Sequence, residues 1–289
     1  MTSTEPTYLT TKEVADLLRV KERKVYDLIA AGEIPHRRII GKLLFPRAEI
    51  VQWIEGTAGN DTGERPAVLT GSHDPLLDWA VRESGCGLAT LLDGSGNGLE
   101  TYAGGDAALC GLHIPDGDDW NVGIVAGRGL RGSVLLTWAQ RARGLVLAPA
   151  IQAEVACLSD LKGKRVVMRQ PGAGAAVLFE RLLAREGLSP EDFVAAAGYA
   201  RTESDAAAAV ASGEADAALG LETMARQFHL GFLPLVTERF DLLVDRRAYF
   251  TEPVQKLLAF TRTQAFVEKA RAMGGYDLSG MGEVRWLSP

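Results

Sequence analysis

Residues 10–32 read TTKEVADLLRVKERKVYDLIAAG, and this stretch decides the fold of the first part of the chain. Its apolar residues recur at intervals of three and four in two runs, which predicts two short amphipathic helices. A threonine, Thr10 or Thr11, can cap the first helix, and Gly32 can end the second. Two short helices joined by a tight turn are typical of a helix-turn-helix, whose second helix can present its first side chains to a major groove.

A β-hairpin is predicted directly after the two helices. Residues 36–45, HRRIIGKLLF, place Gly41 between two short runs of strand-forming residues. Pro46 at a helix start, followed by Ile50 and Trp53, predicts a closing helix, because the core would otherwise be too small to be stable. The basic residues of the hairpin, which we expect to lie together as a wing, are Arg37, Arg38 and Lys42.

Positive charge is concentrated in this region. The whole chain has a formal net charge of −6, yet residues 21–47 hold seven basic and three acidic side chains, a local surplus of +4. The remainder of the chain must then carry −10. A compact basic module on an acidic protein predicts a local site for phosphate rather than a general affinity for nucleic acid.

This order of elements resembles the excisionase/MerR-type winged helix-turn-helix domain. The resemblance covers roughly residues 7–56 and rests on YLTTKEVADLLRV, KVYDLIAAGEIP and GKLLFPRAEIVQWI. It implies a module that binds double-stranded DNA, as a homodimer on paired half-sites. Glu22 departs from the small hydroxyl residues that the family often has at this place. The DNA contacts that the resemblance implies are Lys21, Arg23, Lys24, Tyr26, Arg37, Arg38 and Lys42.

A linker divides the chain. Residues 56–66, GTAGNDTGERP, have no apolar periodicity and consist of turn-forming and solvated residues. We therefore expect a head at 1–56, a linker at 57–66 and a larger domain at 67–289. In that domain short apolar runs alternate with amphipathic stretches, which is typical of α/β units on a largely parallel sheet. The predicted strands are 67–70, 87–91, 107–112, 133–140, 165–169, 217–219 and 232–236, and the predicted helices are 74–83, 98–103, 173–186, 204–212 and 221–230.

Composition and hydropathy exclude several classes of protein. Hydrophobic residues make up 47% and charged residues 24% of the chain, as in a globular protein rather than a disordered one. The first 20 residues do not resemble a secretory signal, and no apolar run approaches the roughly 18 residues that span a bilayer, so we expect a cytosolic protein without a membrane partner. Cys86, Cys110 and Cys157 are far apart and predict buried thiols, with no disulfide, metal or other cofactor.

Three turns of the larger domain place glycine or a small hydroxyl residue where a predicted strand enters a helix. They are 71–74 (GSHD), 94–98 (GSGNG) and 169–174 (RQPGAG). Each one alone is also what an ordinary capped turn looks like. Beyond the carboxyl ends of strands, however, the free N–H groups of the following helices favour anions, and glycine lets a ligand approach the backbone. Three such turns in both halves of the domain predict a shared ligand cleft.

The arrangement resembles the periplasmic-binding-protein-like superfamily, in the cytosolic version found on excisionase-type heads of bacterial regulators. The resemblance covers about residues 66–289 and rests on GSHDPLL, DGSGNGLETYAGGDAALCGLH, RGLVLAP, LSDLKGKRVVMRQPGAGAAVLFERLL and AVASGEADAALGLE. It implies a two-lobed (type II) α/β fold, with lobe 1 at about 67–150 and 240–289 and lobe 2 at about 151–239. The ligand contacts that it implies are Ser72, Ser95, Asn97, Arg169, Gly172, Ala173 and Gly174.

Together the two resemblances imply a one-component transcription regulator that senses a small ligand and is not an enzyme. A cleft of hydroxyl groups and helix N-termini suits a tetrahedral oxyanion, and similar domains occur with molybdate- and tungstate-related proteins. If Glu222 faces the cleft, it favours instead a ligand with an amine or a hydroxyl group, because an unpaired carboxylate repels an anion.

Two other functions stay open on the sequence alone. Residues 127–132, GRGLRG, satisfy the dinucleotide fingerprint after a possible strand at 121–126, as in a nucleotide-dependent oxidoreductase. The following SVLLTWAQ favours a strand over the helix that the fingerprint needs. An architectural DNA-binding protein without a ligand is the second alternative. A hydrolase is not favoured, because Ser72, His73 and Asp74 are adjacent and their side chains diverge.

Overall fold

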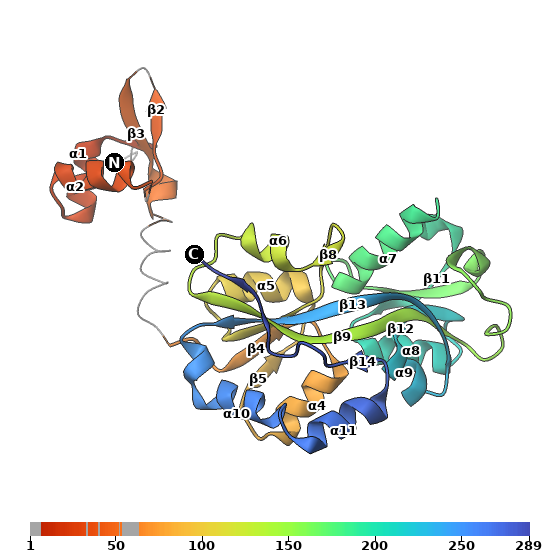
Figure 1. Cartoon of the computed structure of the whole chain (residues 1–289). Coiled ribbons are helices and arrows are strands. Elements are labelled where there is room, and N and C mark those ends of the chain that lie inside the picture. The colour runs from red at the N-terminus through yellow and green to blue at the C-terminus, as the bar shows by residue number, and fades with distance from the viewer. Residues whose placement is uncertain (1–6, 33, 40, 52, 54–63) are drawn as a thin grey trace, which may run out of the picture. The chain divides into compact units, whose positions relative to one another are not determined.

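The computed structural model describes residues 7–32, 34–39, 41–51, 53 and 64–289. Contacts within the chain divide it into two units, Met1–Gly63 and Glu64–Pro289, and each is described by itself (Figure 1). Residues 57–63, most of the predicted linker, lie outside the described residues. Among the residues described, no helix is both long and apolar enough to cross a membrane.

The first unit is a helix-turn-helix followed by a hairpin (Figure 1). Thr10 is the capping residue of the first helix: its hydroxyl accepts the Glu13 N–H, and the Glu13 carboxylate accepts the Thr10 N–H at 2.7 Å. Hydrogen bonds from the Thr10 N–H and hydroxyl group to this carboxylate lower the pKa of Glu13. Gly32, with φ +69°, follows the second helix as predicted. The elements are β1 (Tyr8–Leu9), α1 (Thr11–Leu18), α2 (Glu22–Ala30), β2 (Arg37–Ile39) and β3 (Lys42–Pro46), with residues 47–51 helical.

The hairpin is part of a three-stranded sheet rather than a free pair of strands. β2 and β3 are joined at Gly41, with φ +76°, as predicted. β1 was not predicted, and it pairs Leu9 with Phe45 and Tyr8 with Pro46. Pro46 is therefore the last residue of β3 and directly precedes the helical residues 47–51, in keeping with the predicted helix start. The core beneath this sheet consists of Leu9, Val14, Ala15, Val25, Ile34, Phe45 and Ile50.

The second unit is built on one ten-stranded mixed sheet. Two strands of 15 residues, β9 (Ser133–Leu147) and β13 (Gly231–Asp245), lie antiparallel at its centre and run through the length of the unit (Figure 1). Three mutually parallel strands lie on each side of this pair. The order across the sheet is β11-β10-β12-β9-β13-β6-β4-β5, with β14 and β15 paired to β9.

The central pair divides the unit into two lobes. The chain builds most of lobe 1, crosses to lobe 2 along β9 and returns along β13, so that its last helices again belong to lobe 1. Lobe 1 contains β4 (Val68–Gly71), α4 (Pro75–Glu83), β5 (Ala89–Leu91), α5 (Ser95–Ala103), β6 (Leu109–Leu112), β7 (Pro115–Asp116), β8 (Asp119–Trp120), α6 (Val122–Ala126), α10 (Glu252–Phe260), α11 (Gln264–Met273), β14 (Tyr276–Asp277) and β15 (Val284–Leu287). Lobe 2 contains β10 (Arg165–Arg169), α7 (Gly174–Arg185), β11 (Val194–Ala200), α8 (Glu203–Ala211), β12 (Ala217–Leu221) and α9 (Glu222–Gln227). Short 3-10 turns occupy Leu158–Leu161, Pro190–Asp192 and Ala248–Phe250.

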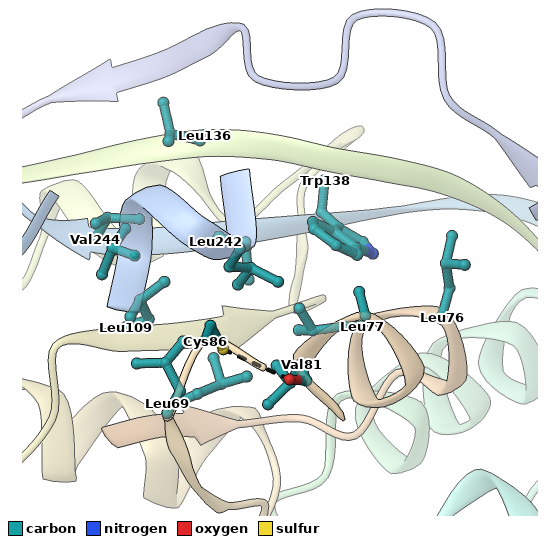
Figure 2. Packing of buried hydrophobic residues seen from close by; sticks show 14 of the residues in the cluster. Leu69, Leu76, Leu77, Val81, Cys86, Leu109, Leu136, Trp138, Leu242 and Val244 are labelled. Carbon is teal, nitrogen blue, oxygen red and sulfur yellow. Dashed lines mark hydrogen bonds between the residues drawn. The ribbon is translucent and has the colours of Figure 1, made fainter. Parts of the chain in front are cut away.

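Each lobe has its own apolar core. In lobe 1, side chains of α4 pack against β4, β6, β9 and β13, and the Cys86 thiol donates to the Val81 carbonyl at 3.6 Å (Figure 2). Lobe 2 has a second cluster in which α7 contributes Leu178, Phe179, Leu182 and Leu183. Cys86 and Cys110 are buried as expected, but Cys157 is partly exposed. Its expected burial is therefore wrong.

Several predicted elements need correction. The possible strand at 121–126 is wrong, because Val122–Ala126 forms helix α6. The strand β11 was missed between α7 and α8. Helix α5 begins at Ser95 rather than at residue 98, so the glycine-rich segment is helical instead of a loop. The other predicted strands and helices are confirmed, although β9 and β13 extend well beyond the predicted ranges.

The early start of α5 depends on a close approach of two glycines, and this gives a first prediction. A Cβ on Gly98 would lie 2.2 Å from the Gly71 Cα of β4, whereas a Cβ on Gly104 would have 3.4 Å to its nearest neighbour. Gly98→Ala should therefore lower the free energy of unfolding by about 1–3 kcal/mol through overpacking, although alanine normally favours a helix. Gly104→Ala is the matched control. Urea unfolding of both variants checks this, and equal stabilities would contradict the close packing of α5 on β4.

Candidate functional site

The start of α2 presents an exposed basic surface in the first unit. Lys21 is the residue that precedes α2, and Arg23 and Lys24 lie in its first turn. All three side chains are exposed, as is Tyr26, which is 50% accessible. These four predicted contacts therefore lie within one and a half helical turns, at the end of α2 that a helix-turn-helix presents to DNA.

The hairpin does not gather its three basic residues on one face, so that expectation is wrong. The register pairs Arg38 with Leu43, while Arg37 and Lys42 occupy positions of the opposite parity. Neighbouring residues of a strand point to opposite faces, which separates Arg38 from the other two. Arg37 is also paired with Glu49 at 2.7 Å. In the part of the chain that the structure describes, Arg38 and Lys42 form no ion pair and are exposed.

In the second unit the glycine turns meet where the two lobes touch. A Cβ on Gly96, in the turn of lobe 1, would lie 3.2 Å from the Gly172 carbonyl oxygen of lobe 2. A Cβ on Gly174, the first residue of α7, would lie 2.6 Å from the His113 carbonyl oxygen. At Gly174 only a residue without a side chain allows this approach, and at Gly96 a Cβ would be tighter than an ordinary contact. The contact brings the starts of α5 and α7 together.

The third turn, residues 71–74, reaches the starts of α5 and α7 through the contact of Ser72 with Ser95. Both side chains are buried, and their hydroxyl oxygens are 2.7 Å apart. Ser95 Oγ also accepts the His113 N–H at 3.3 Å. Of the seven predicted ligand contacts, five therefore lie at the points where these turns approach one another: Ser72, Ser95, Gly172, Ala173 and Gly174.

The other two predicted contacts and Glu222 are engaged elsewhere. Asn97 is exposed and donates to Asp93 Oδ2 at 2.9 Å. Arg169 donates from its three nitrogens to the carbonyl oxygens of residues 200 and 201 and to Glu203 at 2.6 Å, so it ties β10 to the start of α8. Glu222 is paired with Arg226 rather than standing unpaired in a cleft.

A buried chain of charged residues connects the two lobes, and sequence reasoning did not find it. Glu238 of β13 lies opposite Arg141 of β9 and accepts hydrogen bonds from Arg141 and, at 2.5 Å, from Arg143. Arg141 donates to Asp74, the capping residue of α4 in lobe 1, at 2.9 Å. Arg143 donates to Glu203, the first residue of α8 in lobe 2, at 3.0 Å. The chain reads Asp74, Arg141, Glu238, Arg143, Glu203, Arg169.

The charges in this chain balance. Burial alone would raise the pKa of Glu238, but the positive charges of Arg141 and Arg143 outweigh burial and hold it well below its usual range. The same competition lowers the pKa of Glu203. Three guanidinium groups thus neutralise three carboxylates in the buried interior of the unit. Removing one partner from such a network leaves a buried charge without compensation, which is strongly destabilising.

The sequence does contain a signal for this network. Residues 141 and 143 lie two apart in the middle of the long apolar run 133–147, and residue 238 interrupts the apolar run 231–245. Charged residues two apart on a strand share a face, and a charge inside an apolar strand needs a partner. What the sequence lacks is the identity of the partners, which lie 60 to 97 positions away.

Two further features lie outside the meeting of the lobes. The fingerprint-like loop at 127–132 connects helix α6 to strand β9, so it lacks the strand before and the helix after it that hold a pyrophosphate. A hollow of about 330 Å³ lies at the amino ends of β4 and β6, the edge of the sheet opposite to the glycine turns. Its lining residues are Glu64, Arg65, Pro66, Ala67, Ala108, Thr251 and Pro253.

Each of the two units matches a known protein family. Residues 8–58 match a helix-turn-helix domain family, and residues 78–262 match the PBP superfamily domain. YvgK of Bacillus subtilis (strain 168), described as uncharacterized, is 26% identical over 309 positions, which cover 97% of this chain and 98% of that protein.

A solved structure with a TM-score above 0.5 shares the fold of the second unit. A candidate phosphate ABC transporter substrate-binding protein from Clostridium perfringens, with bound phosphate, is 12% identical at a TM-score of 0.52, over 71% of this chain and 96% of that one. A hydrogen-peroxide-bound OxyR mutant from Corynebacterium glutamicum is 12% identical at a TM-score of 0.49, over 91% and 89% of the two chains. Because the superfamily model matches more than half of the 289 residues, this chain belongs to the PBP superfamily.

Proposed function

We propose that this protein is a transcription regulator whose first unit binds double-stranded DNA and whose second unit senses a small ligand where its lobes meet. The chain combines a helix-turn-helix domain with a PBP-like domain. The observation that carries the proposal is the presence, in one chain, of an exposed basic start of α2 and of three converging glycine turns. We further propose a binding role without catalysis, since the charged groups at this place are committed to one another.

On the DNA side, the proposal gives two roles to the basic residues. The side chains at the start of α2 enter the major groove, and Arg38 and Lys42 of the hairpin contact phosphates. One head is small, and small heads gain affinity and specificity by binding paired half-sites. We therefore propose that the protein acts as a homodimer.

On the ligand side, we propose an oxyanion held by neutral donors. Backbone N–H groups at the starts of α5 and α7 are donors of this kind, and so is whichever hydroxyl group of Ser72 and Ser95 does not donate to the other. The bound phosphate of the Clostridium perfringens protein is in keeping with an anion, and a molybdate-like or tungstate-like ion belongs to the same class. A ligand that prefers one angle between the lobes would shift the placement of the heads in a dimer and so change the fit to paired half-sites.

The DNA-binding half of the proposal is tested by Arg38→Ala combined with Lys42→Ala. We expect weaker binding to every duplex and a shallower dependence of log affinity on log salt, by about 0.9 for each phosphate that the variant no longer neutralises and so by about 2 in all. Fluorescence anisotropy titrations over a series of salt concentrations measure both quantities. The control is the pair Lys162→Ala and Lys256→Ala, which removes equal charge from the second unit. An unchanged slope in the Arg38 and Lys42 variant would remove the hairpin from the DNA interface.

A further inference from the structure

His113 lies where the lobes touch and is a member of the site that the sequence did not indicate. The residue is 2% exposed and follows β6 in lobe 1. A Cβ on Gly174, at the start of α7 in lobe 2, would lie 3.0 Å from its ring carbon Cε1 and 3.1 Å from Nδ1. Its backbone N–H is bonded to Ser95. The Nδ1–Cε1 edge of the imidazole thus faces the first turn of α7, and the backbone of the residue is bonded to Ser95 of lobe 1.

Glu238 decides which nitrogen of this ring carries a proton. Nδ1 of His113 lies 3.2 Å from Oε2 of Glu238, and this carboxylate is ionised at neutral pH because Arg141 and Arg143 lower its pKa. An ionised carboxylate only accepts, so Nδ1 must donate. In a neutral imidazole the other nitrogen, Nε2, then has a lone pair and no hydrogen.

The ring is neutral near pH 7. Burial lowers the pKa of His113, and the charges of Arg141 and Arg143 lower it further, which together outweigh the opposing effect of Glu238. These are the charged groups that face the ring: Glu238 from β13 and the two arginines from β9. The starts of α5 and α7 contribute only the uncharged Ser95 and Gly174.

Nε2 of His113 is an acceptor that the chain leaves unused. No hydrogen bond to Nε2 is formed by the residues that the structure describes. Nε2 is also not among the fully buried atoms without a partner, such as Arg141 Nε. A ligand that donates to Nε2 would form a hydrogen bond that the described residues do not supply.

We propose that Nε2 of His113 accepts a hydrogen bond from the ligand, so that the ligand is an anion that keeps an O–H group beside its charged oxygens. The inference rests on the proposed function and makes its ligand class narrower. Hydroxyl and backbone donors at Ser72, Ser95 and α7 bind the charged oxygens of the ligand, while Nε2 of His113 accepts a hydrogen bond from the ligand O–H. A fully deprotonated oxyanion would instead place a lone pair of electrons against that of Nε2, and the mismatch should weaken its binding by at least about tenfold.

Matched pairs of probes test this on the full chain at about pH 7.5. Phosphate and sulfate are close in size and charge, but only phosphate keeps an O–H; lactate and propanoate are both monocarboxylates, but only lactate has a hydroxyl group. Thermal unfolding and calorimetric titration should show that phosphate or lactate binds at least about tenfold more tightly than its partner. Tighter binding of phosphate than of sulfate would identify the ligand as an inorganic oxyanion that keeps a hydrogen. Tighter binding of lactate than of propanoate would identify it as a hydroxy acid.

Two variants connect the preference to the histidine. His113→Phe keeps a ring beside Phe240 but removes the acceptor, so both members of the preferred pair should bind alike. His113→Gln can place its amide oxygen near the position of Nε2 and should recover part of the preference. If either variant does not fold, the wild-type comparison still decides.

The outcomes separate the inference from the proposed function. Sulfate or molybdate binding as tightly as phosphate, with no preference for lactate, would overturn the role of His113 while leaving a ligand-sensing regulator intact. If phosphate, sulfate, molybdate, lactate and propanoate all leave the melting temperature of the second unit unchanged, both the inference and the oxyanion part of the proposed function are wrong.

Discussion

Glu238→Ala should lower the free energy of unfolding of the second unit by about 3–5 kcal/mol, the cost of removing one partner from a buried ion network. The carboxylate of Glu238 accepts from Arg141 and from Arg143, and both guanidinium groups are buried. Without it, two positive charges lie close together in an interior of low dielectric, and Nδ1 of His113 loses its acceptor. Urea unfolding of the full chain, followed by circular dichroism and tryptophan fluorescence, measures the loss.

Glu222 is the control that distinguishes the loss of the buried network from the loss of an exposed ion pair. Glu222 also pairs with an arginine, Arg226, but its side chain is 24% exposed and that of Arg226 is 61% exposed. A pair of this kind contributes about 0.5 kcal/mol or less, so Glu222→Ala should leave stability nearly unchanged. Glu238→Gln keeps the shape but not the charge and should lie between the two. Equal stabilities of the two alanine variants would show that the buried network does not hold the lobes together.

The position of Glu238 explains why one residue has so large an effect. Arg141 is paired in register with Tyr276 and bonds to Asp74, both of lobe 1, whereas Arg143 is paired with Leu221 of lobe 2. Glu238 bonds to both arginines. It therefore fixes the geometry at the point where β9 passes from one lobe to the other, which is also where a ligand would change the angle between them.

The head could be predicted because its signals are local. Thr10 and Glu13 cap α1 over three residues, and Gly32 and Gly41 mark the ends of α2 and β2 through their own backbone preference. The strand β1 was missed because two residues are too few to show a period. The prediction that the basic residues of the hairpin lie together on one face was wrong. It counted charges along the hairpin and ignored that neighbouring residues of a strand point to opposite faces.

Only the part of the candidate site that backbone conformation determines, the glycine turns, could be predicted from the sequence. Glycine where a strand enters a helix permits a close approach of another part of the chain, so the turns with Gly96 and Gly174 could be found. Asn97 lies apart from the other predicted contacts because α5 begins at Ser95: two residues further along, a side chain points about 200° around the helix. The ion network joins residues far apart in the chain, and no local rule pairs them.

Asp241, a second buried carboxyl group on β13, predicts that the stability of the second unit depends on pH. The pKa of Glu238 is lowered by charged partners, whereas burial decides the pKa of Asp241. Burial raises the pKa of Asp241 to about 6. Its Oδ2 accepts from Asn121 at 2.8 Å, but Oδ1 is sealed without a partner, as is the hydroxyl of Thr137 on the opposite residue of β9. Unlike Glu238, this carboxylate has no guanidinium group bonded to it among the described residues, so burial decides its ionisation.

Asp241→Asn should therefore stabilise the second unit more as the pH rises. The folded pKa of about 6 lies above the ordinary 3.8, so the favourable contribution of the protonated group is complete below 3.8 and is lost as the pH rises through 6. A difference of roughly two pKa units corresponds to about 3 kcal/mol at alkaline pH. Because asparagine does not ionise, its advantage should grow by about 2 kcal/mol between about pH 4.5 and about pH 8. Urea unfolding of both proteins at the two pH values measures it.

The exposed Asp277 provides the control for this titration. Hydrogen bonds from the Ser279 N–H and hydroxyl group lower the pKa of Asp277, so its stabilising contribution is present above 3.8 and Asp277→Asn should have the opposite sign of effect at alkaline pH. An advantage of Asp241→Asn that is equal at both pH values would mean that the variant acts through packing or through a new bond to Thr137. An advantage that shrinks with rising pH would mean that the carboxylate of Asp241 is stabilised in the folded protein.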